Sequence, residues 1–213
     1  MVQNPFDIYT EEYEKWFEEN KTTFQSEILA IRQVMPVGKK GIEIGIGSGI
    51  FAEQLGINFG IDPSESMLAL ARKRNLNVVK GFAENLPFPD GSFDFAAFIT
   101  SICFIEHPEK AISEAYRIIK TGGKIIIAFI DRNSNLGQNL IKDKEGSKFY
   151  RVATFYSVPE VIKMLEVAGF TISDIVQTLT NINALGVEQP LKGFGKGSFV
   201  VISAEKQEMA YTD

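Results

Sequence analysis

Two acidic side chains flank a run of alternating glycines between two short apolar segments. Glu43 precedes Gly45, Gly47 and Gly49, and Asp62 ends the second apolar segment. Glycine permits positive φ angles and the close approach of a ligand to the backbone. A carboxylate before the first glycine would repel a pyrophosphate and attract an ammonium group, while an acid in the position of Asp62 can accept hydrogen bonds from both hydroxyls of a ribose. The pattern therefore predicts a site for a nucleoside that carries a positive charge.

The apolar segments predict the elements that position these residues. Residues 41–44 fit a strand, residues 50–55 a short helix, and a second strand ends at Asp62. Further strands are expected at 78–81, 93–99, 124–130, 171–178 and 198–204, with helices running to 119 and over 158–168. Repetition of strand, helix and strand implies parallel strands with right-handed crossovers. An α/β protein is expected, in which the glycine turn is either a ligand site or a simple connection.

The spacing of the glycines separates two classes of nucleoside site. Nicotinamide and flavin sites use GxGxxG, in which the third glycine lets the helix pack beneath a pyrophosphate. Here the pattern over residues 43–49 is ExGxGxG, and it resembles the class I S-adenosylmethionine-dependent methyltransferases, in particular their small-molecule, ubiquinone/menaquinone-methyltransferase-like subgroup. The segments FAENLPF at 82–88 and KTGG at 120–123 extend the resemblance, which is most specific over 41–131. An NAD(P)-dependent oxidoreductase is the enzymatic alternative, and the spacing disfavours it.

The resemblance implies a fold and a cofactor. The fold would be three-layered and Rossmann-like, with a seven-stranded, mostly parallel sheet whose last strand is antiparallel. Residues 1–213 would form a single methyltransferase domain with an N-terminal helical cap (1–38), a cofactor-binding core (39–130), a variable lid or substrate segment (131–156), and a C-terminal helix with the last strands (157–213). The cofactor would be S-adenosylmethionine and the product S-adenosylhomocysteine. The implied reaction is in-line methyl transfer to oxygen, nitrogen or carbon of a small molecule; a non-catalytic S-adenosylmethionine-binding sensor or subunit is the alternative.

Carried over residue by residue, the family pattern names a set of cofactor contacts. They are Glu43, Gly45, Ile46, Gly47, Gly49, Asp62, Pro63, Met67, Phe82, Ala83, Glu84 and Thr100. Phe82 departs from the pattern, because many relatives have an acid there that accepts from the adenine amino group. Three arrangements stay open. Glu84 replaces that acid, or the Phe82 ring stacks on the purine or contacts its edge. In the third, Phe82 fills the core and only the Ala83 backbone contacts adenine.

Aromatic residues recur at helical spacing before the first strand. Tyr9, Tyr13 and Trp16 belong to this pattern, which most often marks a packed core. In the methyltransferases that the chain resembles, an N-terminal helix with a similar Tyr-x-x-Trp-Phe pattern folds over the cofactor, and an aromatic face suits a sulfonium cation. The three side chains are therefore expected either in the core or in a cap over cofactor and substrate.

The sequence assigns no catalytic residue. His107 is the only histidine, and its place before a proline at a helix start is typical of a capping or solvated residue. Cys103 lies in an apolar run without a nearby basic residue and is expected to pack. Asp131 and Asn133 carry possible metal ligands, but no second acid stands near Thr100, so no metal is expected. Methyl transfer from a sulfonium depends chiefly on positioning, so a base is not required.

Composition limits the partners. The 213 residues carry a net charge of −5 and one cysteine, whereas nucleic-acid-binding proteins normally present a basic patch; no nucleic-acid partner is expected. No stretch approaches the ~18 apolar residues of a membrane span, and the start of the chain does not resemble a signal segment. We expect a cytoplasmic protein without a membrane partner, acting on a small molecule as a monomer or homodimer.

Overall fold

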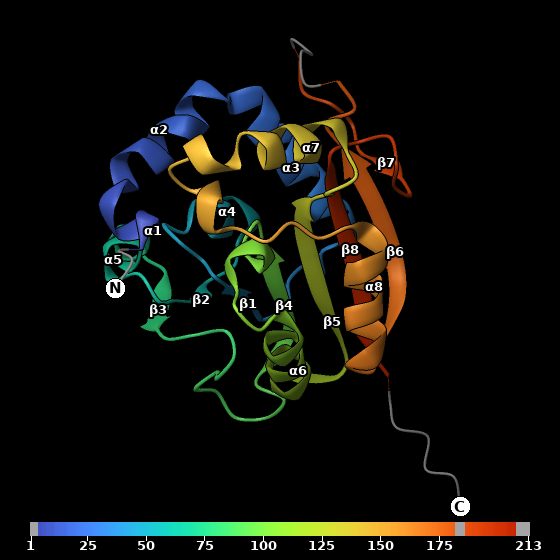
Figure 1. Cartoon of the computed structure of the whole chain (residues 1–213). Helices are drawn as coiled ribbons and strands as arrows, with labels where there is room; N and C mark the ends of the chain where they lie inside the picture. The colour runs from blue at the N-terminus through green and yellow to red at the C-terminus, as the bar shows by residue number, and fades with distance from the viewer. Residues whose placement is uncertain (1–3, 182–185, 208–213) are drawn as a thin grey trace, which may run out of the picture.

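A sheet with helices on both faces forms the centre of the computed structural model, which describes residues 4–181 and 186–207 (Figure 1). Within those residues the sheet has eight strands in the order β3-β2-β1-β4-β5-β8-β6-β7. The strands span Gly41–Ile44 (β1), Phe59–Asp62 (β2), Asn77–Lys80 (β3), Phe93–Ile99 (β4), Ile119–Ile130 (β5), Phe170–Thr178 (β6), Leu191–Lys192 (β7) and Phe199–Lys206 (β8).

The strand directions agree with the sequence-based prediction, but the strand count does not. Neighbours from β3 to β5 run parallel, and β8 lies antiparallel between β5 and β6. The predicted mostly parallel sheet with an antiparallel last strand is therefore confirmed. The predicted count of seven is wrong for the described residues, because β7 pairs with the outer edge of β6. A two-residue strand is too short to show an alternating apolar pattern.

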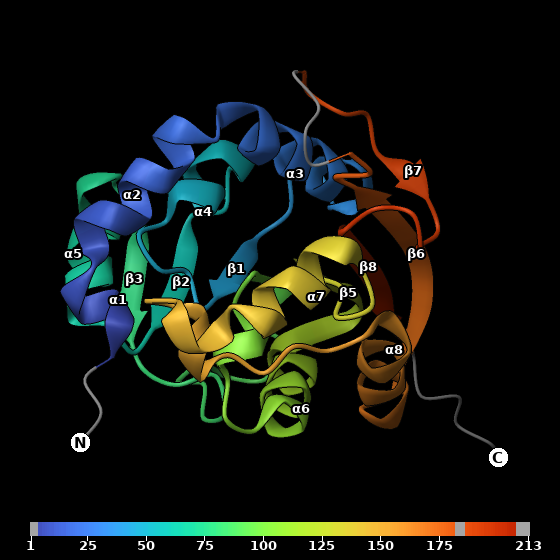
Figure 2. The same cartoon turned by 45° about the horizontal axis from the view of Figure 1, so that its top comes forward.

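Helices form separate layers on the two faces of the sheet (Figure 2). On one face, α6 and α8 pack in a cluster that includes Ile127; on the other, α3, α4 and α5 pack in a cluster that includes Ile126. Consecutive β5 side chains thus point to opposite faces, as in any strand, and the expected three-layer arrangement is observed. The α-helices span Pro5–Ile8 (α1), Thr10–Glu19 (α2), Lys21–Val34 (α3), Ile50–Leu55 (α4), Glu65–Lys73 (α5), Pro108–Ile118 (α6), Asn135–Lys142 (α7) and Val158–Val167 (α8).

The N-terminal region is helical as predicted but is broken twice. α1 begins after Asn4, whose side-chain oxygen accepts the Phe6 N–H at 3.1 Å and so caps the helix. α2 ends near Asn20, whose side-chain amide donates to the Trp16 carbonyl at 2.8 Å. Because of these breaks, α1 and α2 reach over the ends of β1 and β2 while α3 lies against β5, β6 and β8. Among the described residues, no helix has the length and apolar character needed to cross a bilayer.

Candidate functional site

A cavity of about 590 Å3 lies at the carboxyl ends of β1, β2 and β4. Its floor contains Glu43, the glycine turn and Asp62, and its roof contains α1 and Tyr13 of α2. The chain builds the sheet outward from β1 to β3 and then returns to place β4 on the other side of β1. Ligands of open α/β sheets bind at such a switch point, so this cavity is the leading candidate site.

The turn after β1 passes very close to the end of β4. Gly45 has a φ of +76°, and a Cβ atom there would lie 2.4 Å from the Cβ atom of Ser101. Ser101 is held in place because its hydroxyl donates to the Ile44 carbonyl at 2.7 Å. Position 45 requires both a positive φ and room for the close approach of Ser101, and only glycine satisfies both without displacing Ser101.

Asp62 is fixed between the glycine turn and α1. Its carboxylate oxygens accept the N–H groups of Gly47 at 2.9 Å and Ser64 at 2.8 Å. Ser64 in turn caps α5 by accepting the Met67 N–H, and its hydroxyl donates to Asp7 of α1 at 2.5 Å. Burial raises the pKa of Asp62, and the two N–H donors oppose that shift. The side chain is thus a positioned acceptor on the cavity floor.

Glu43 is a second buried acid beside Asp62. Its side chain is only 1% exposed, and its Oε2 atom has no hydrogen-bond partner among the described residues. Burial, followed by the charge of Asp62, raises the pKa of Glu43 well above its usual value, while the Ala52 N–H acts in the opposite direction. A buried carboxyl oxygen without a donor costs free energy. The cavity floor is therefore suited to a positively charged group.

Tyr13 covers these two acids from α2. Burial first, then the charges of Glu43 and Asp62, raise the pKa of its phenol far above the usual value, so it stays neutral. The ring contacts Phe6 of α1 edge-on, with 6.0 Å between ring centroids. Tyr13 therefore connects the acidic floor to an aromatic roof.

The loop after β3 forms the outer rim of the cavity. Phe82 is 66% exposed, so the arrangement in which it fills the core is wrong. Ala83 and Glu84 line the cavity next to it, and one Glu84 oxygen accepts the His107 N–H at 3.2 Å. His107 stands at the N-cap position of α6 and is exposed, and its side chain makes no capping bond; of the two expected roles, the solvated one is observed. The Phe82 ring is left free to contact a ligand.

Two segments that are far apart in the sequence meet above the cavity. Phe149 packs against Tyr9 and Tyr13, with 6.1 Å between ring centroids in both pairs. The neighbouring Lys148 forms an ion pair with Glu12 of α2 and lies over the Tyr9 ring. We call α1, α2 and residues 143–152 the cover. Its closure depends on side-chain contacts, namely aromatic pairs, ion pairs and the Ser64–Asp7 hydrogen bond. Apart from bonds to the residues that adjoin it in the chain, no backbone hydrogen bond joins it to the rest of the described residues.

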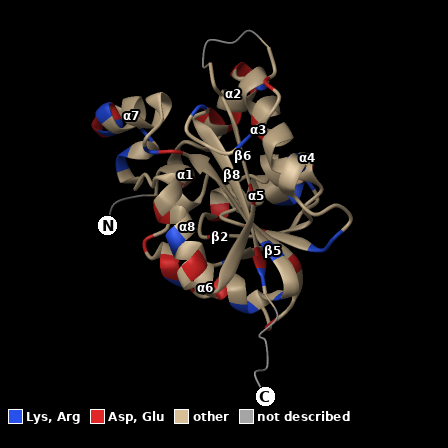
Figure 3. Ribbon diagram, turned by 90° about the vertical axis from the view of Figure 1, so that its right-hand side faces the viewer, with Lys and Arg blue, Asp and Glu red and all other residues tan. Residues whose placement is uncertain are grey.

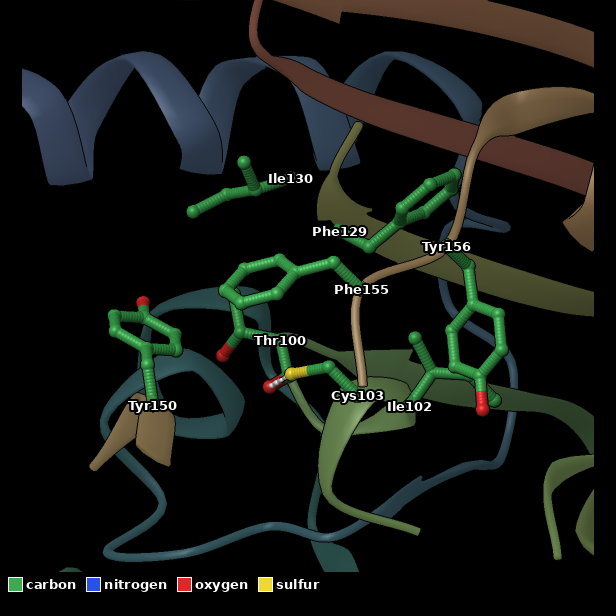
Figure 4. Close-up of a pocket in the computed structure, with 8 residues that line it drawn as sticks. All are labelled: Thr100, Ile102, Cys103, Phe129, Ile130, Tyr150, Phe155 and Tyr156. Carbon is green, nitrogen blue, oxygen red and sulfur yellow. Dashed lines mark hydrogen bonds between the residues drawn. The ribbon is translucent and has the colours of Figure 1, made fainter. Parts of the chain in front are cut away.

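A smaller cavity of about 20 Å3 adjoins the larger one at Thr100 (Figure 4). Thr100 has a φ of +51°, which is strained for a β-branched residue, and its carbonyl accepts the Cys103 thiol at 3.5 Å. Burial raises the pKa of this thiol to about 12, which agrees with a packing role. The lining is otherwise aromatic and aliphatic, from Ile102, Phe129, Ile130, Tyr150, Phe155 and Tyr156.

The larger cavity brings together most of the residues named from the sequence. It is lined by Tyr13, Glu43, Gly45, Gly47, Asp62, Pro63, Phe82, Ala83, Glu84 and Thr100. Among the described residues, no group of three or more His, Cys, Asp and Glu side chains is arranged to hold a metal ion.

Five of the named residues lie outside this lining. Ile46 and Met67 are buried in the core, and Gly49 stands at the start of α4 with a φ of +78°. Tyr9 belongs to the cover through Phe149. Trp16 is 43% exposed and packs against the neighbouring Phe17 rather than over the cavity.

The cavity also contains residues that the sequence reasoning did not select. Phe6 stands three positions before Tyr9 and seven before Tyr13, so the helical spacing could have revealed it. No local signal marks the others, because they enter the lining through the tertiary fold. These are Asn4, Pro5, Asp7, Ile61, Gly81, Ile99, Phe104, Ile105, Glu106 and Val152. Ser101 also lines the cavity, and the family resemblance does place it, with Thr100, near the methionine part.

Comparison with known proteins finds similar sequences and folds. A family model described as a methyltransferase domain matches residues 42–127. An uncharacterized protein of Methanocaldococcus jannaschii is 46% identical, over 95% of this chain and 99% of that protein. A Thermotoga maritima protein, described as an SAM-dependent methyltransferase and possible histamine N-methyltransferase, is 44% identical with a TM-score of 0.93, over 95% of this chain and 99% of that one. A ubiquinone/menaquinone biosynthesis C-methyltransferase of Rickettsia bellii is 31% identical, over 63% of this chain and 58% of that enzyme.

Proposed function

Because the chain belongs to the family of S-adenosylmethionine-dependent methyltransferases, we propose that this enzyme methylates an oxygen, nitrogen or carbon atom of a small molecule. The observation that carries the proposal is the pair of buried acids, Glu43 and Asp62, on the floor of a covered cavity. A volume of about 590 Å3 falls within the roughly 300–1,000 Å3 of small-molecule sites. A cytoplasmic location is part of the same proposal.

The residues present fit S-adenosylmethionine, which the family uses as its cofactor. The unpaired Oε2 of Glu43 would accept the ammonium group, and Asp62 would accept the ribose hydroxyls. The exposed Phe82 ring and the Ala83 backbone would receive adenine at the rim, so of the three arrangements left open we favour contact by Phe82. Thr100, at the junction of the two cavities, would lie beside the methionine part.

When bound, this cofactor supplies a methyl group that is already activated on a sulfonium. The protein's remaining tasks are to orient the acceptor and to exclude water. Tyr13, Phe149 and the Lys148–Glu12 ion pair suit the second task, because Tyr13 lines the cavity and the other contacts join α2 to residues 148–149 above it. We therefore propose that residues 1–38 act as a cap and residues 131–156 as a lid that selects the acceptor.

A small acceptor is favoured by the covered cavity and by the surface. In the view of Figure 3, Lys and Arg are interspersed with Asp and Glu rather than gathered into one basic face. Among the relatives, the Thermotoga protein is described as a possible N-methyltransferase and the Rickettsia enzyme as a C-methyltransferase. Both atoms, together with oxygen, belong in a first search.

The proposal is tested by incubating the purified chain with methyl-labelled S-adenosylmethionine and a metabolite panel sorted by acceptor atom. We expect label in one class of small molecule and an equal amount of S-adenosylhomocysteine. Label that appears only in added RNA or protein would contradict the small-molecule proposal.

The pH dependence of cofactor binding should report on Glu43. Its pKa is raised, so the carboxyl must lose a proton before it attracts an ammonium group, and affinity should go on rising with pH above the range in which an ordinary glutamate ionises. Glu43→Gln cannot ionise, so it should bind roughly tenfold more weakly at pH 8 with a flatter profile. Titration calorimetry over this range gives both curves; parallel curves would exclude Glu43 as the ammonium partner.

Tyr13 and Trp16 provide a matched test of the cap. Tyr13 lines the cavity, whereas Trp16 is 43% exposed outside it. Tyr13→Ala should speed cofactor dissociation severalfold, up to about tenfold, because an aromatic contact is worth roughly 0.5–1.5 kcal/mol. Trp16→Ala should leave the rate unchanged. Stopped-flow release of S-adenosylhomocysteine measures both, and equal effects would refute the assignment of Tyr13.

A further inference from the structure

The charged side chains that line the cofactor cavity all carry the same sign. Among the described residues of the lining there is no Lys, Arg or His, and the acids are Asp7, Glu43, Asp62, Glu84 and Glu106. None of these acids forms a salt bridge with another described residue. A cleft with charges of one sign and walls of low dielectric concentrates the electric field and attracts ligands of the opposite charge. Affinity in this cavity should therefore depend on the net charge of the ligand.

The two acids on the floor of the cavity are affected most strongly, because they are buried. Glu43 is 1% exposed and Asp62 is 9% exposed, and the Oε2 atom of Glu43 has no hydrogen-bond partner among the described residues. Burial, followed by the charge of Asp62, raises the pKa of Glu43, since two negative charges in one buried site repel each other. A ligand with a net positive charge offsets this repulsion, whereas a ligand without net charge leaves most of it in place.

Asp7 brings a further acid to the floor from the cover. Ser64, which is fully buried, donates its hydroxyl to Asp7 of α1 at 2.5 Å and its N–H to Asp62 at 2.8 Å. One serine therefore joins α1 to the proposed partner of the ribose. The charge of Asp7 adds to the effect of burial in raising the pKa of Asp62, against the N–H groups of Ser64 and Gly47. With α1 in this closed position, three carboxylates lie around one binding site.

The methyl donor and its product differ by one positive charge. S-adenosylmethionine carries an ammonium, a carboxylate and a sulfonium, so its net charge is positive. In methyl transfer the acceptor atom bonds to the methyl carbon, the carbon–sulfur bond breaks, and its electron pair stays on sulfur. The positive charge passes to the methylated acceptor or to a proton that the acceptor releases. S-adenosylhomocysteine is therefore a thioether without net charge, and it lacks the group that the acids attract most.

We propose that the cavity distinguishes donor from product by charge: its acids hold S-adenosylmethionine beneath a closed α1 and bind S-adenosylhomocysteine more weakly, so that α1 opens and the product leaves. This inference rests on the methyltransferase function proposed above. Asp7 is the positioning residue, because it carries a charge on α1 and meets the floor through Ser64. Among the described residues no backbone hydrogen bond joins α1 to the floor, so α1 can open. A ligand shifts such an equilibrium only by its difference in affinity for the two states, and the sulfonium supplies that difference.

Binding of three nucleosides to the purified protein tests the dependence on charge. They are S-adenosylmethionine, S-adenosylhomocysteine and sinefungin, in which a carbon that bears an amino group replaces the sulfur and restores a positive charge without a sulfonium methyl. We expect calorimetry to show that both charged ligands bind roughly tenfold more tightly than S-adenosylhomocysteine. The preference should shrink as salt is added, because Asp7 is exposed and salt screens its charge.

Asp7→Asn and Glu11→Gln provide a matched pair of variants. Asp7→Asn keeps an oxygen that can accept the Ser64 hydroxyl but removes the charge, so it should lower the preference for S-adenosylmethionine severalfold without weakening S-adenosylhomocysteine binding. Glu11 is an exposed acid of α2 that lines a different groove, between α2 and α5. Glu11→Gln removes the same charge from the cover outside the cavity, so it should leave the preference unchanged. The melting temperature of each variant shows whether the fold is intact.

The outcomes separate this inference from the function on which it rests. It is overturned if S-adenosylhomocysteine binds as tightly as S-adenosylmethionine, or if the two variants change the preference equally. It is also overturned if sinefungin binds no better than S-adenosylhomocysteine, because the sulfonium methyl rather than the charge would then set the preference. If none of the three nucleosides binds, the proposed function itself fails.

Discussion

Asp62→Ala is expected to weaken S-adenosylhomocysteine binding roughly 10- to 100-fold, the loss that follows from removing a charged hydrogen-bond acceptor. The substitution removes the proposed partner of the ribose and also frees the N–H groups of Gly47 and Ser64, which now donate to its two oxygens. The glycine turn would lose one of its bonds to β2 and keep the two from the Gly45 and Ile46 N–H groups to the Ile61 carbonyl. Calorimetry on the purified variant gives the affinity, and the melting temperature shows whether the fold survives.

Asp131→Asn is the matched control for that measurement. Asp131 is also a buried acid that follows a strand at the same edge of the sheet, but it lines a different cavity with Ser134 and Asn135. The Asp131→Asn variant should bind S-adenosylhomocysteine with the affinity of the unaltered protein. If Asp62→Ala keeps full affinity for S-adenosylhomocysteine, or if the affinity of both variants falls by the same factor, the assignment of Asp62 to the ribose is wrong.

Gly45→Ala should cost roughly 3 kcal/mol of unfolding free energy, which combines the strain of a left-handed backbone with overpacking against Ser101. The new Cβ atom would stand 2.4 Å from the Ser101 Cβ atom. Gly56→Ala is the control, because Gly56 has a φ of +71° with nothing within 4 Å of a Cβ atom. The Gly56→Ala variant should lose only the unfolding free energy that comes from backbone strain, roughly 1–2 kcal/mol.

Urea denaturation of both variants measures the difference. Adding Ser101→Gly to Gly45→Ala should recover part of the loss, because it removes the atom that the new side chain meets. Equal losses at positions 45 and 56, with no recovery in the double variant, would mean that the turn does not need its close approach to the loop after β4.

The sequence was most informative where local chemistry and tertiary structure impose the same requirement. β4 is found at residues 93–99, the expected range, because a run that is apolar except for Asp94 is bounded there by a Pro-Asp-Gly-Ser turn and by Thr100. Glu43 and Asp62 were identifiable because they stand on either side of the glycine turn, in the positions that the family resemblance assigns to acids. Their side chains do line one cavity.

The cover could not be predicted in the same way. Its closure depends on Phe149 meeting Tyr9 and Tyr13 across more than a hundred residues, and helical spacing cannot say which face of α2 turns inward. Trp16 shows the consequence: it follows the aromatic pattern, yet it is largely exposed beside Phe17.

A crystal structure with S-adenosylhomocysteine bound is the most direct test of the cofactor site. We predict that the ribose hydroxyls lie within hydrogen-bond distance of the Asp62 carboxylate, that the amino group lies beside Glu43, and that the purine edge meets Phe82. A ligand bound in another cavity would contradict the account, and so would a ligand bound in the opposite orientation, with adenine over Glu43.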